Sequence, residues 1–583
     1  MLVLTLAIHD ACALSATKAV GGGVQMALLP GQASSASWPR FLFLFRGVSG
    51  SFRLAELHSA ALTLGVDEQQ LTFEAASSLA ANLKQPEIAD AGGDVGPDLL
   101  QWVALPSAEV ATAVASRCST VRGAFEVWAT ARFEPACSLA PAEAAQQADA
   151  RWRLLADCVH ADTAFEARAR MLGAMQADSW RVDVINIGTN KPRSLAAKVA
   201  LMETFDSLLG PLPGAVDLKS PAQIVTLIED CREPDGPRAA ARRSDLVQAP
   251  HWLGLGRLLT CGAAAHLSRF ALSDRSYLGR TTLPPEYSYL MAVQARVLPG
   301  HRVLDPFCGT CSTLLSCAAL GAITMGVEAD ERVLHGTIAD GAHLRPKGSK
   351  ALTSEPSASG IATNFAEGGL PPPERLLLGD MASFDALLTA ACGADKAAAN
   401  IAFDAIVTDP PYGLMEGLGA LYVPLGQRLT SLLRLASRRL KLGGRLVFLL
   451  PLPAGAHAAH ARPETLPPAR CLSIERISRQ RLSQRLHRLL VTMVKVAEPS
   501  TEAEGLLGGA EGAEVGKRTT TSSLAPDEGV NRRNERGTHP NEGAPTSSLA
   551  HQAPWEDWWR TVQAWEDEAS SWPVVPPADQ ASS

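Results

Sequence analysis

The residues with the clearest chemical meaning form the motif Asp409-Pro410-Pro411-Tyr412, directly after an apolar segment. A carboxylate and a backbone carbonyl held side by side can accept both N–H bonds of a planar amino group, and an aromatic ring can stack on the base that carries it. Because both prolines fix φ, the Asp409 carboxylate and the Pro410 carbonyl would point at one spot. A rigid turn could have the same composition, but after a buried strand the motif favours a site that orients an exocyclic amine for attack on an electrophilic methyl group.

A second set of polar residues also follows apolar segments, at Asp305, Gly309, Glu328 and Asp380. In an open parallel sheet, ligands bind beyond the carboxyl ends of the strands, where a glycine turn lets the backbone approach a ligand. A carboxylate after the next strand, such as Glu328, can accept hydrogen bonds from ribose hydroxyls, and Asp380 would lie near an adenine edge. The run after Asp305 does not match the GxGxxG fingerprint, so this loop taken alone could also be a plain strand-to-helix turn.

These motifs require a sheet whose strand ends meet at one edge. Apolar segments of strand length alternate with helical patterns in the second half of the chain and begin near residues 302, 322, 375, 403 and 445. This alternation predicts an α/β fold with a doubly wound parallel sheet. A hairpin over residues 472–496 would add one antiparallel edge strand, and residues 348–372 look like a surface loop inserted between two strands.

The first half of the chain predicts a separate α+β module. Strand patterns occupy residues 41–45 and 179–187, and helical patterns occupy residues 53–65 and 195–210. A stretch rich in Arg, Pro and Asp at 232–246 is the expected linker. We therefore expect an N-terminal extension over residues 1–38, the α+β module with its linker over 39–245, and a second domain over 246–498.

The composition of residues 499–583, rich in Gly, Ser, Thr, Pro and Glu, predicts a disordered tail. Within it, the tryptophans of segment 554–569 share one helical face, which fits either a helix that folds back on the body or one that docks a partner. The tail holds 14 Asp and Glu residues against 6 Lys and Arg, so residues 1–498 carry a net charge of +1 although the whole chain carries −7. A near-neutral body predicts that any contact with nucleic acid is made by a local basic patch.

The eleven cysteines show no pairing rhythm, which argues against a disulfide framework. The single CxxC, Cys308 to Cys311, has no thioredoxin-like flanks, so a structural role is favoured over redox chemistry. No run approaches the roughly 18 to 20 apolar residues needed to cross a bilayer, and we expect neither a membrane segment nor a metal site. We expect a cytoplasmic protein and leave an organelle address open, because residues 1–40 contain only two basic residues.

Together, DPFCGT at Asp305 and DPPYG at Asp409 resemble the amino methyltransferases that use S-adenosyl-L-methionine. More specifically, the chain resembles the catalytic subunit of the tRNA (guanine-10 N2)-methyltransferase family. Further segments carry this resemblance: FRLAEL at 52, GAVDLKSP at 214, LGRLL at 255, SYLGRTTLPPEYSYLMAVQA at 276 and GVEADERVLHG at 326. It implies a Rossmann-like S-adenosylmethionine methyltransferase domain preceded by an α+β, THUMP-like RNA-binding module.

The resemblance implies transfer of a methyl group to N2 of a guanosine, at position 10, in tRNA. On the cofactor side it implies contacts from Thr281, Thr282, Asp305 and Gly309 to the methionine part, from Glu328 to the ribose and from Asp380 to the adenine. On the substrate side it implies that the guanine amine is held by Asp409, Pro410, Pro411 and Tyr412, with Glu416 as a further acceptor. It also implies tRNA as a partner and a small zinc-binding activator subunit.

The sequence departs from the family pattern at three places. Cys311 stands where the family has a second glycine, Met415 stands where an arginine is usual, and Thr282-Leu283-Pro284 stands where Ser-Met-Asp is usual. A side chain at Cys311 could crowd the cofactor. A second hypothesis is therefore a tRNA-binding scaffold with impaired catalysis.

A third hypothesis is a DNA adenine N6-methyltransferase, because DPPY also occurs in that class. The N-terminal module and the lack of a helix-turn-helix pattern argue against it. The last hairpin carries a cluster of basic residues that could form either a solvated charged face or a set of phosphate contacts, namely Arg476, Arg479, Arg481, Arg485 and Arg488.

Overall fold

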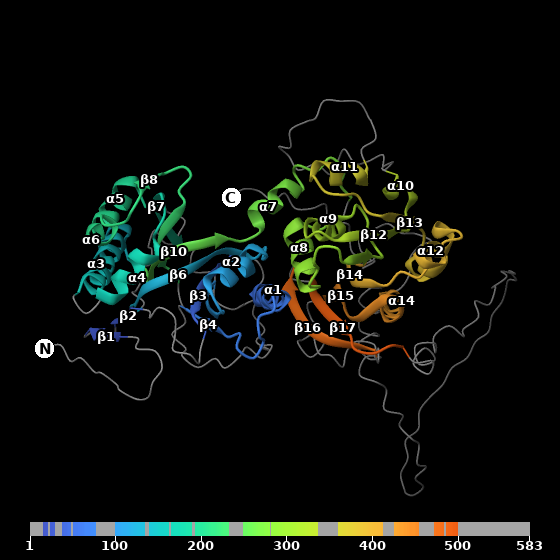
Figure 1. Ribbon diagram of the computed structural model, residues 1–583, viewed down its shortest axis with the longest axis horizontal. Coiled ribbons are helices and arrows are strands. Elements are labelled where there is room, and N and C mark those ends of the chain that lie inside the picture. The colour runs from blue at the N-terminus through green and yellow to red at the C-terminus, as the bar shows by residue number, and fades with distance from the viewer. Residues whose placement is uncertain are drawn as a thin grey trace, which may run out of the picture.

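The computed structural model contains two adjoining units, one for each half of the chain (Figure 1). The structure describes residues 16–20, 24–28, 38–47, 50–76, 99–134, 139–161, 165–188, 193–232, 249–279, 282–335, 360–411, 425–453, 471–482 and 486–499. The first 15 residues, most of the expected linker and the tail from residue 500 with its tryptophan-rich segment lie outside the described residues. None of the described helices is long and apolar enough to cross a membrane.

The first unit is built on a ten-stranded sheet in the order β4-β5-β3-β6-β10-β9-β7-β8, with β2 also paired to β6 and β1 paired to β2. Its strands are β1 Ala16–Val20, β2 Val24–Leu28, β3 Arg40–Phe45, β4 Phe73–Ala75, β5 Leu100–Ala104, β6 Val121–Arg132, β7 Ser179–Ile187, β8 Ala215–Val216, β9 Gln223–Asp230 and β10 Trp252–Cys261. Its helices are α1 Gly50–Thr63, α2 Ala108–Ser116, α3 Pro141–His160, α4 Phe165–Ala174, α5 Leu195–Glu203, α6 Asp206–Leu209 and α7 Ala264–Leu267.

Local patterns predict four segments of this unit, and each forms the expected kind of element. The strand patterns at 41–45 and 179–187 are confirmed by β3 and β7, and the helical pattern at 53–65 is confirmed by α1. The pattern at 195–210 forms two helices, α5 and α6, which are separated at Thr204 and Phe205. Phe205 is fully buried edge-on against Trp152, with ring centroids 5.8 Å apart, so packing against α3 decides where the helix breaks.

Strands β6 and β10 form a long antiparallel pair that joins the two halves of the first sheet, from Trp252 opposite Arg132 to Cys261 opposite Gly123. β10 also pairs with β9, so it fills the position between β6 and β9. The sequence places residue 252 in the second domain, whereas the pairing places it in the first sheet. Periodicity could not distinguish these alternatives, because only the partner strands decide to which sheet a strand belongs. The division into domains at residue 246 stays a prediction.

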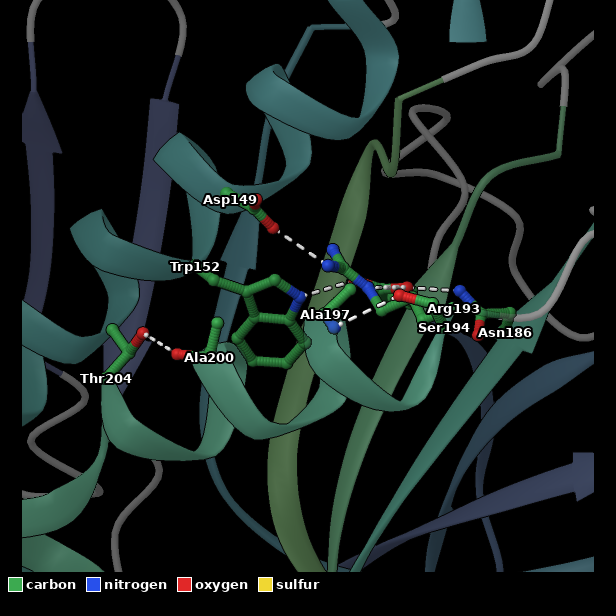
Figure 2. Close-up of polar contacts among 9 residues, drawn as sticks. Asp149, Trp152, Asn186, Arg193, Ser194, Ala197, Ala200 and Thr204 are labelled. Atoms are coloured by element: carbon green, nitrogen blue, oxygen red, sulfur yellow. Dashed lines mark hydrogen bonds and ion pairs between the residues drawn. The ribbon is translucent and has the colours of Figure 1, made fainter. Parts of the chain in front are cut away.

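A buried polar network fixes the start of α5 in the first unit (Figure 2). The Glu229 side chain is 2% exposed, and it accepts hydrogen bonds from Trp152 Nε1 at 2.6 Å, from Asn186 Nδ2 and from Arg193 Nη2 at 2.7 Å. Arg193 also pairs with Asp149 at 2.8 Å. Because a buried carboxylate is stable only when it is paired and hydrogen-bonded, this network ties α3, β7 and β9 to the segment that begins α5.

The second unit is a seven-stranded sheet in the order β13-β12-β11-β14-β15-β17-β16. Its strands are β11 Arg302–Asp305, β12 Ile323–Glu328, β13 Arg375–Leu378, β14 Phe403–Thr408, β15 Leu440–Pro453, β16 Leu472–Arg481 and β17 Leu486–Lys495. Its helices are α8 Pro285–Gln294, α9 Ser312–Ala319, α10 Glu331–Leu334, α11 Ile361–Glu367, α12 Phe384–Cys392, α13 Lys396–Ala399 and α14 Leu425–Arg439, with short 3₁₀ helices η3 at Ser268–Phe270 and η5 at Met381–Ser383.

The first five strands of this sheet run parallel, with helices on both faces, which confirms the predicted doubly wound fold. Successive residues of β14 face opposite ways, so Val407 packs in one cluster with Met291 of α8 and Ile406 packs in another with Leu432 of α14. Burial on both faces explains why these strands read as continuous apolar runs.

Two details of the second unit differ from the sequence expectation. The antiparallel strand β17 lies between β15 and β16, so the edge strand β16 runs in the same direction as β15. Residues 348–372 include helix α11 rather than only a surface loop, and Phe365 of this helix is fully buried. The polar and glycine-rich flanks of α11 concealed its few apolar residues.

Helix α1 of the first unit packs against the edge of the second sheet. Ser51 Oγ donates to the carbonyl oxygen of Arg479 at 2.6 Å and accepts from the amide of the same residue at 3.2 Å. Phe52 is fully buried and meets the ring of Tyr287 from α8 edge-on, with centroids 6.3 Å apart. The last residues of β16 are therefore held next to the first unit.

Candidate active site

Asp305 ends β11 with a side chain that is only 1% exposed. Its Oδ1 accepts from the Phe307 amide at 3.0 Å and the Thr408 hydroxyl at 2.6 Å, and its Oδ2 accepts from the Thr313 hydroxyl. Burial, with a smaller contribution from nearby Asp409, raises the pKa of Asp305 to about 6, although these hydrogen bonds act to lower it. Asp305 thus joins the ends of β11 and β14 to the first turn of α9. Any effect of Asp305 on a ligand would act through the loop between β11 and α9, which its hydrogen bonds hold in place.

The glycine turn after β11 has open space beside it. Gly309 has φ 51°, and a Cβ at this position would meet no atom within 4 Å. Its amide donates to Glu328 Oε2 at 2.9 Å, while Glu328 Oε1 accepts from the Asp330 amide at 2.9 Å. Burial raises the pKa of Glu328 more than its backbone hydrogen bonds lower it. Each carboxylate oxygen has a second lone pair, so Glu328 can hold the turn and also accept from a ligand.

The acidic residues of both motifs lie at one edge of the sheet, where the parallel strands end, which we call the carboxyl edge. β11 pairs in parallel with β12 on one side and with β14 on the other, so the residues that follow these strands are neighbours. The amide of Gly379 donates to the carbonyl oxygen of Glu328 at 2.9 Å, which places exposed Asp380 next to the end of β12. The carboxyl edge therefore gathers Asp380, Glu328, Asp305 and Asp409, in that order.

Thr282 connects the segment before α8 to the glycine turn. Its Oγ1 donates to the Gly279 carbonyl at 2.9 Å, accepts from the Gly279 amide at 2.8 Å and lies 3.2 Å from the Thr310 hydroxyl. The structure thus brings Thr282 to the loop that contains Gly309, as the resemblance implies. Its contact with a cofactor stays a prediction.

Helix α11 fixes the same segment from the other side. Asn364, 2% exposed, accepts from the Tyr277 amide at 3.2 Å through Oδ1 and donates to the Tyr277 carbonyl at 2.8 Å through Nδ2. The Tyr277 hydroxyl donates to the Val333 carbonyl at 2.6 Å. Sequence reasoning missed Asn364, because the insertion that contains it resembled a loop.

The Cys311 side chain packs in the core, and its sulfur lies 4.0 Å from the carbonyl oxygen of Gly309 in the glycine turn. It adopts φ 67° and ψ 32°, a left-handed conformation that glycine would favour, and its side chain is fully buried in a cluster with Leu314 and Phe365. A hydrogen bond to Cys311 and burial raise the pKa of the Cys308 thiol. A Cβ at Gly326 would lie 2.8 Å from the Cys308 sulfur, so this thiol packs on β12. Both positions agree with a structural role for the CxxC.

The Asp409-Pro410-Pro411 segment directly follows β14 and is held by a residue that the sequence did not single out. Arg428 of α14 is 6% exposed, and its Nη1 donates to the carbonyl oxygen of Pro411. Asp409 itself is half-buried. In the sequence, Arg428 is one of several arginines in an amphipathic helix, and only its burial distinguishes it.

Three predicted site residues lie outside the described residues, namely Thr281, Tyr412 and Glu416. The departure at Met415 lies outside them as well. Their proposed roles rest on the motifs alone. Among the residues that the structure describes, no group of three or more His, Cys, Asp or Glu could hold a metal ion.

Strand spacing sets the distance between the two sets of acceptors at the carboxyl edge. Neighbouring strands lie about 4.8 Å apart, so the ends of β12 and β14, with β11 between them, are separated by about 10 Å. Glu328 and Gly309 lie on one side of this span, and Asp409 with Pro410 lies on the other. The acceptor of Glu328 and the acceptors of Asp409 and Pro410 therefore lie along the same edge, on either side of β11.

Comparison with curated proteins finds relatives in animals and in a slime mould. Each is named tRNA (guanine(10)-N(2))-methyltransferase TRMT11. The Gallus gallus protein is 28% identical over 352 residues, which cover 56% of this chain and 69% of that protein. The Homo sapiens protein is 27% identical over 332 residues, 53% of this chain and 65% of that protein. The Dictyostelium discoideum protein is 31% identical over 279 residues, 44% of this chain and 48% of that protein.

Solved structures overlap the chain more loosely, and no protein-family model matches it. TrmN from Thermus thermophilus gives a TM-score of 0.37 at 17% identity, over 79% of this chain and all of that one. A possible methylase from Clostridium difficile 630 gives 0.34 at 10% identity, over the same share of this chain. The sequence relatives confirm the resemblance that the motifs predict: over about half of its length, this chain is similar to proteins named tRNA (guanine(10)-N(2))-methyltransferase.

Proposed function

We propose that this protein is an S-adenosylmethionine-dependent tRNA methyltransferase that methylates N2 of a guanosine, at position 10 of tRNA. The observation that carries the proposal is the arrangement at the carboxyl edge, where the glycine turn of β11 and the Asp409-Pro410-Pro411 segment of β14 lie on paired strands. The aligned parts of the vertebrate relatives cover about two thirds of their length, and their printed activity supports the same assignment.

The residues at the glycine turn fit the cofactor. The open space beside Gly309 gives room for close approach, Glu328 has acceptor capacity for ribose hydroxyls, and Asp380 is exposed at the adjacent strand end. When bound, S-adenosylmethionine supplies an electrophilic methyl group on a sulfonium. Thr282 and Thr310, which contact each other through their hydroxyls, would position its methionine part.

The Asp409-Pro410-Pro411 segment would orient the guanine amine. The carboxylate of Asp409 accepts one N–H bond and the carbonyl of Pro410 accepts the other, so the nitrogen lone pair is directed at the methyl group. The Asp409 carboxylate would also take the proton that the methylated amine releases. Arg428 keeps the segment in place through the Pro411 carbonyl, and Tyr412 is proposed to stack on the base.

We propose that the first unit, as a THUMP-like module, binds the tRNA, and that a small zinc-binding activator subunit completes the enzyme. The domain limits proposed from the sequence and a cytoplasmic location belong to the same proposal. Fluorescence imaging of the tagged full chain tests the location, and isolation of a bound zinc-containing subunit tests the partner.

Transfer of labelled methyl groups to unmodified tRNA tests the activity. The protein with its activator should methylate tRNA, and digestion to nucleosides should show N2-methylguanosine. Asp409→Ala should lower kcat by about 100-fold or more, because an acceptor aligned with the reacting amine is lost. Asp404→Ala is the matched control, because Asp404 lies on the same strand at the opposite edge.

The same assay separates the alternatives. No methyl transfer by the unmodified chain, together with tRNA binding, would establish the scaffold with impaired catalysis. Formation of N6-methyladenine in DNA would establish the DNA methyltransferase. Equal activity of Asp409→Ala and the unmodified chain would exclude the proposed site.

A further inference from the structure

Arg488 lies at the carboxyl edge on β17, two strands from β14. β14, β15 and β17 are adjacent, with Thr408 opposite Phe448 and Pro451 opposite Arg488. From a strand spacing of about 4.8 Å and a rise of about 3.4 Å per residue, Arg488 and Asp409 are separated by about 12 Å between backbones. The strands β15, β17 and β16 extend past the end of β14, so they form one wall of the region in front of Asp409.

The Arg488 side chain is held on the same face of the sheet as the α8 helix. Its Cζ atom lies 4.6 Å from the ring centroid of Tyr287, and its Nε donates to Gln480 Oε1 at 2.6 Å. Gln480 Nε2 in turn donates to the Tyr287 hydroxyl at 2.7 Å. Arg488 and Gln480 are 6% and 7% exposed. This arrangement fixes the guanidinium in one orientation before any ligand arrives.

Within the described residues, the fixed partners of Arg488 are neutral. A largely buried charge is costly unless an opposite charge compensates it. The acidic residue of β16, Glu475, lies toward the other end of that strand and pairs with Arg296 and Arg445. His487, Arg479 and Arg481 occupy the same strand ends as Arg488 and add only neutral or positive groups. The described ends of β16 and β17 thus carry three arginines and no carboxylate.

The first unit meets the second at the same corner. Ser51 of α1 is bonded to the backbone of Arg479, and Phe52 packs on Tyr287, the ring that supports Arg488. In the order of the strands, Arg488 on β17 lies between this contact on β16 and Asp409 after β14.

We propose that Arg488, oriented by Gln480 and Tyr287, contacts a phosphate of the RNA backbone beside the target nucleotide. The inference rests on the proposed function, since it takes RNA as the substrate. Arginine in a fixed orientation suits phosphate, because its planar group donates two parallel hydrogen bonds. Contacts of this kind position the substrate and carry no sequence information.

The sharpest test is Gln480→Glu, which offers Arg488 a carboxylate of nearly the same shape without removing the guanidinium. Binding of unmodified tRNA to the full chain would be measured at several salt concentrations. We expect affinity at low salt to fall about tenfold and the slope of log affinity against log salt to decrease by about one, as for loss of a phosphate contact. Thermal stability should be maintained or raised, because the buried charge gains an internal partner.

Two further variants test whether the effect depends on the charge of Arg488 and on its position. Arg488→Lys should retain most of the salt slope, because it keeps the charge. Arg438→Met is the control: Arg438 is exposed at the end of α14, pairs with Asp385 and should leave tRNA binding unchanged. Binding of S-adenosylhomocysteine, measured by calorimetry, should be the same in all variants.

Unchanged tRNA affinity and salt slope in a folded Gln480→Glu variant would overturn the inference. If the unmodified chain binds tRNA and the variant weakens this binding, the inference stands even when no methyl transfer is detected. In that case the proposed methyltransferase activity is refuted, while the proposed phosphate contact is retained. If methyl transfer is detected and the variant binds tRNA normally, the activity stands and the phosphate contact is refuted.

Discussion

The free energy of unfolding of the Asp305→Asn variant, minus that of the unmodified chain, should increase as the pH rises. The pKa of Asp305 is raised by burial from 3.8 to about 6. The folded state therefore holds this proton more tightly than the unfolded state. The stability that the group contributes is complete below the unfolded pKa of about 4 and is lost as the pH rises through about 6.

A shift of about two pKa units corresponds to about 3 kcal/mol between the limits. Roughly half of this, about 1.5 kcal/mol, falls between pH 5 and pH 8, where the protein can be handled. Asparagine does not ionise, so Asp305→Asn removes this dependence. Its Oδ1 can still accept from Phe307 and Thr408, whereas its Nδ2 must donate to Thr313, which gives a constant offset independent of pH.

The assay is urea unfolding of both proteins at pH 5, 6, 7 and 8. The free energy of unfolding of Asp305→Asn minus that of the unmodified chain should increase by about 1.5 kcal/mol across this range. Asp404→Asn is the control: hydrogen bonds from Lys441 and the Arg302 amide lower the pKa of Asp404 although burial acts to raise it. This carboxylate is therefore ionised in both the folded and the unfolded state from pH 5 to pH 8, and the difference for Asp404→Asn should stay flat over this range. A difference for Asp305→Asn that stays flat from pH 5 to pH 8 would refute the assignment of Asp305 as a buried, titrating strand clamp.

Two further substitutions test the surroundings of the site. Cys311→Gly should change the free energy of unfolding by no more than about 1 kcal/mol, because relief of the left-handed conformation offsets the lost burial of the thiol. Its affinity for S-adenosylhomocysteine, measured by calorimetry, should stay within about twofold of that of the unmodified chain. A tenfold gain in this affinity would mean that the Cys311 side chain crowds the cofactor. Arg428→Met should lower kcat about 10- to 100-fold with little change in cofactor affinity, because the Pro411 carbonyl loses its donor and the amine acceptors shift. Arg428→Lys should recover part of kcat in the same methyl-transfer assay, and equal rates for all three proteins would exclude a positioning role.

Much of the catalytic unit could be predicted from the sequence. The strands before Asp305, Glu328 and Asp409 are continuous apolar runs, and the motifs that end them are local in the chain. Because parallel strands end at the same edge of a sheet, local patterns alone placed these carboxylates together. The doubly wound fold followed from the same alternation of strands and helices.

The tertiary structure decided what each side chain contacts. Asp305 reads in the sequence as a ligand-facing residue, yet Thr408 and Thr313 enclose its carboxylate. Arg428 reaches Pro411 from a separate helix, and Asn364 reaches Tyr277 across 87 positions of the chain. No local pattern encodes such contacts, because they depend on which elements pack together.

The sequence by itself thus determined the helices and strands and the reactive residues that follow the strands. Both are local, because hydrophobic periodicity and turn residues depend only on residues that are close together in the chain. Only the tertiary structure decided that β10 completes the first sheet, that Cys311 turns into the core and that Arg488, with neutral partners, lies two strands from Asp409. These outcomes depend on long-range pairing and on side-chain direction, which are set when separate elements bury their apolar faces against one another.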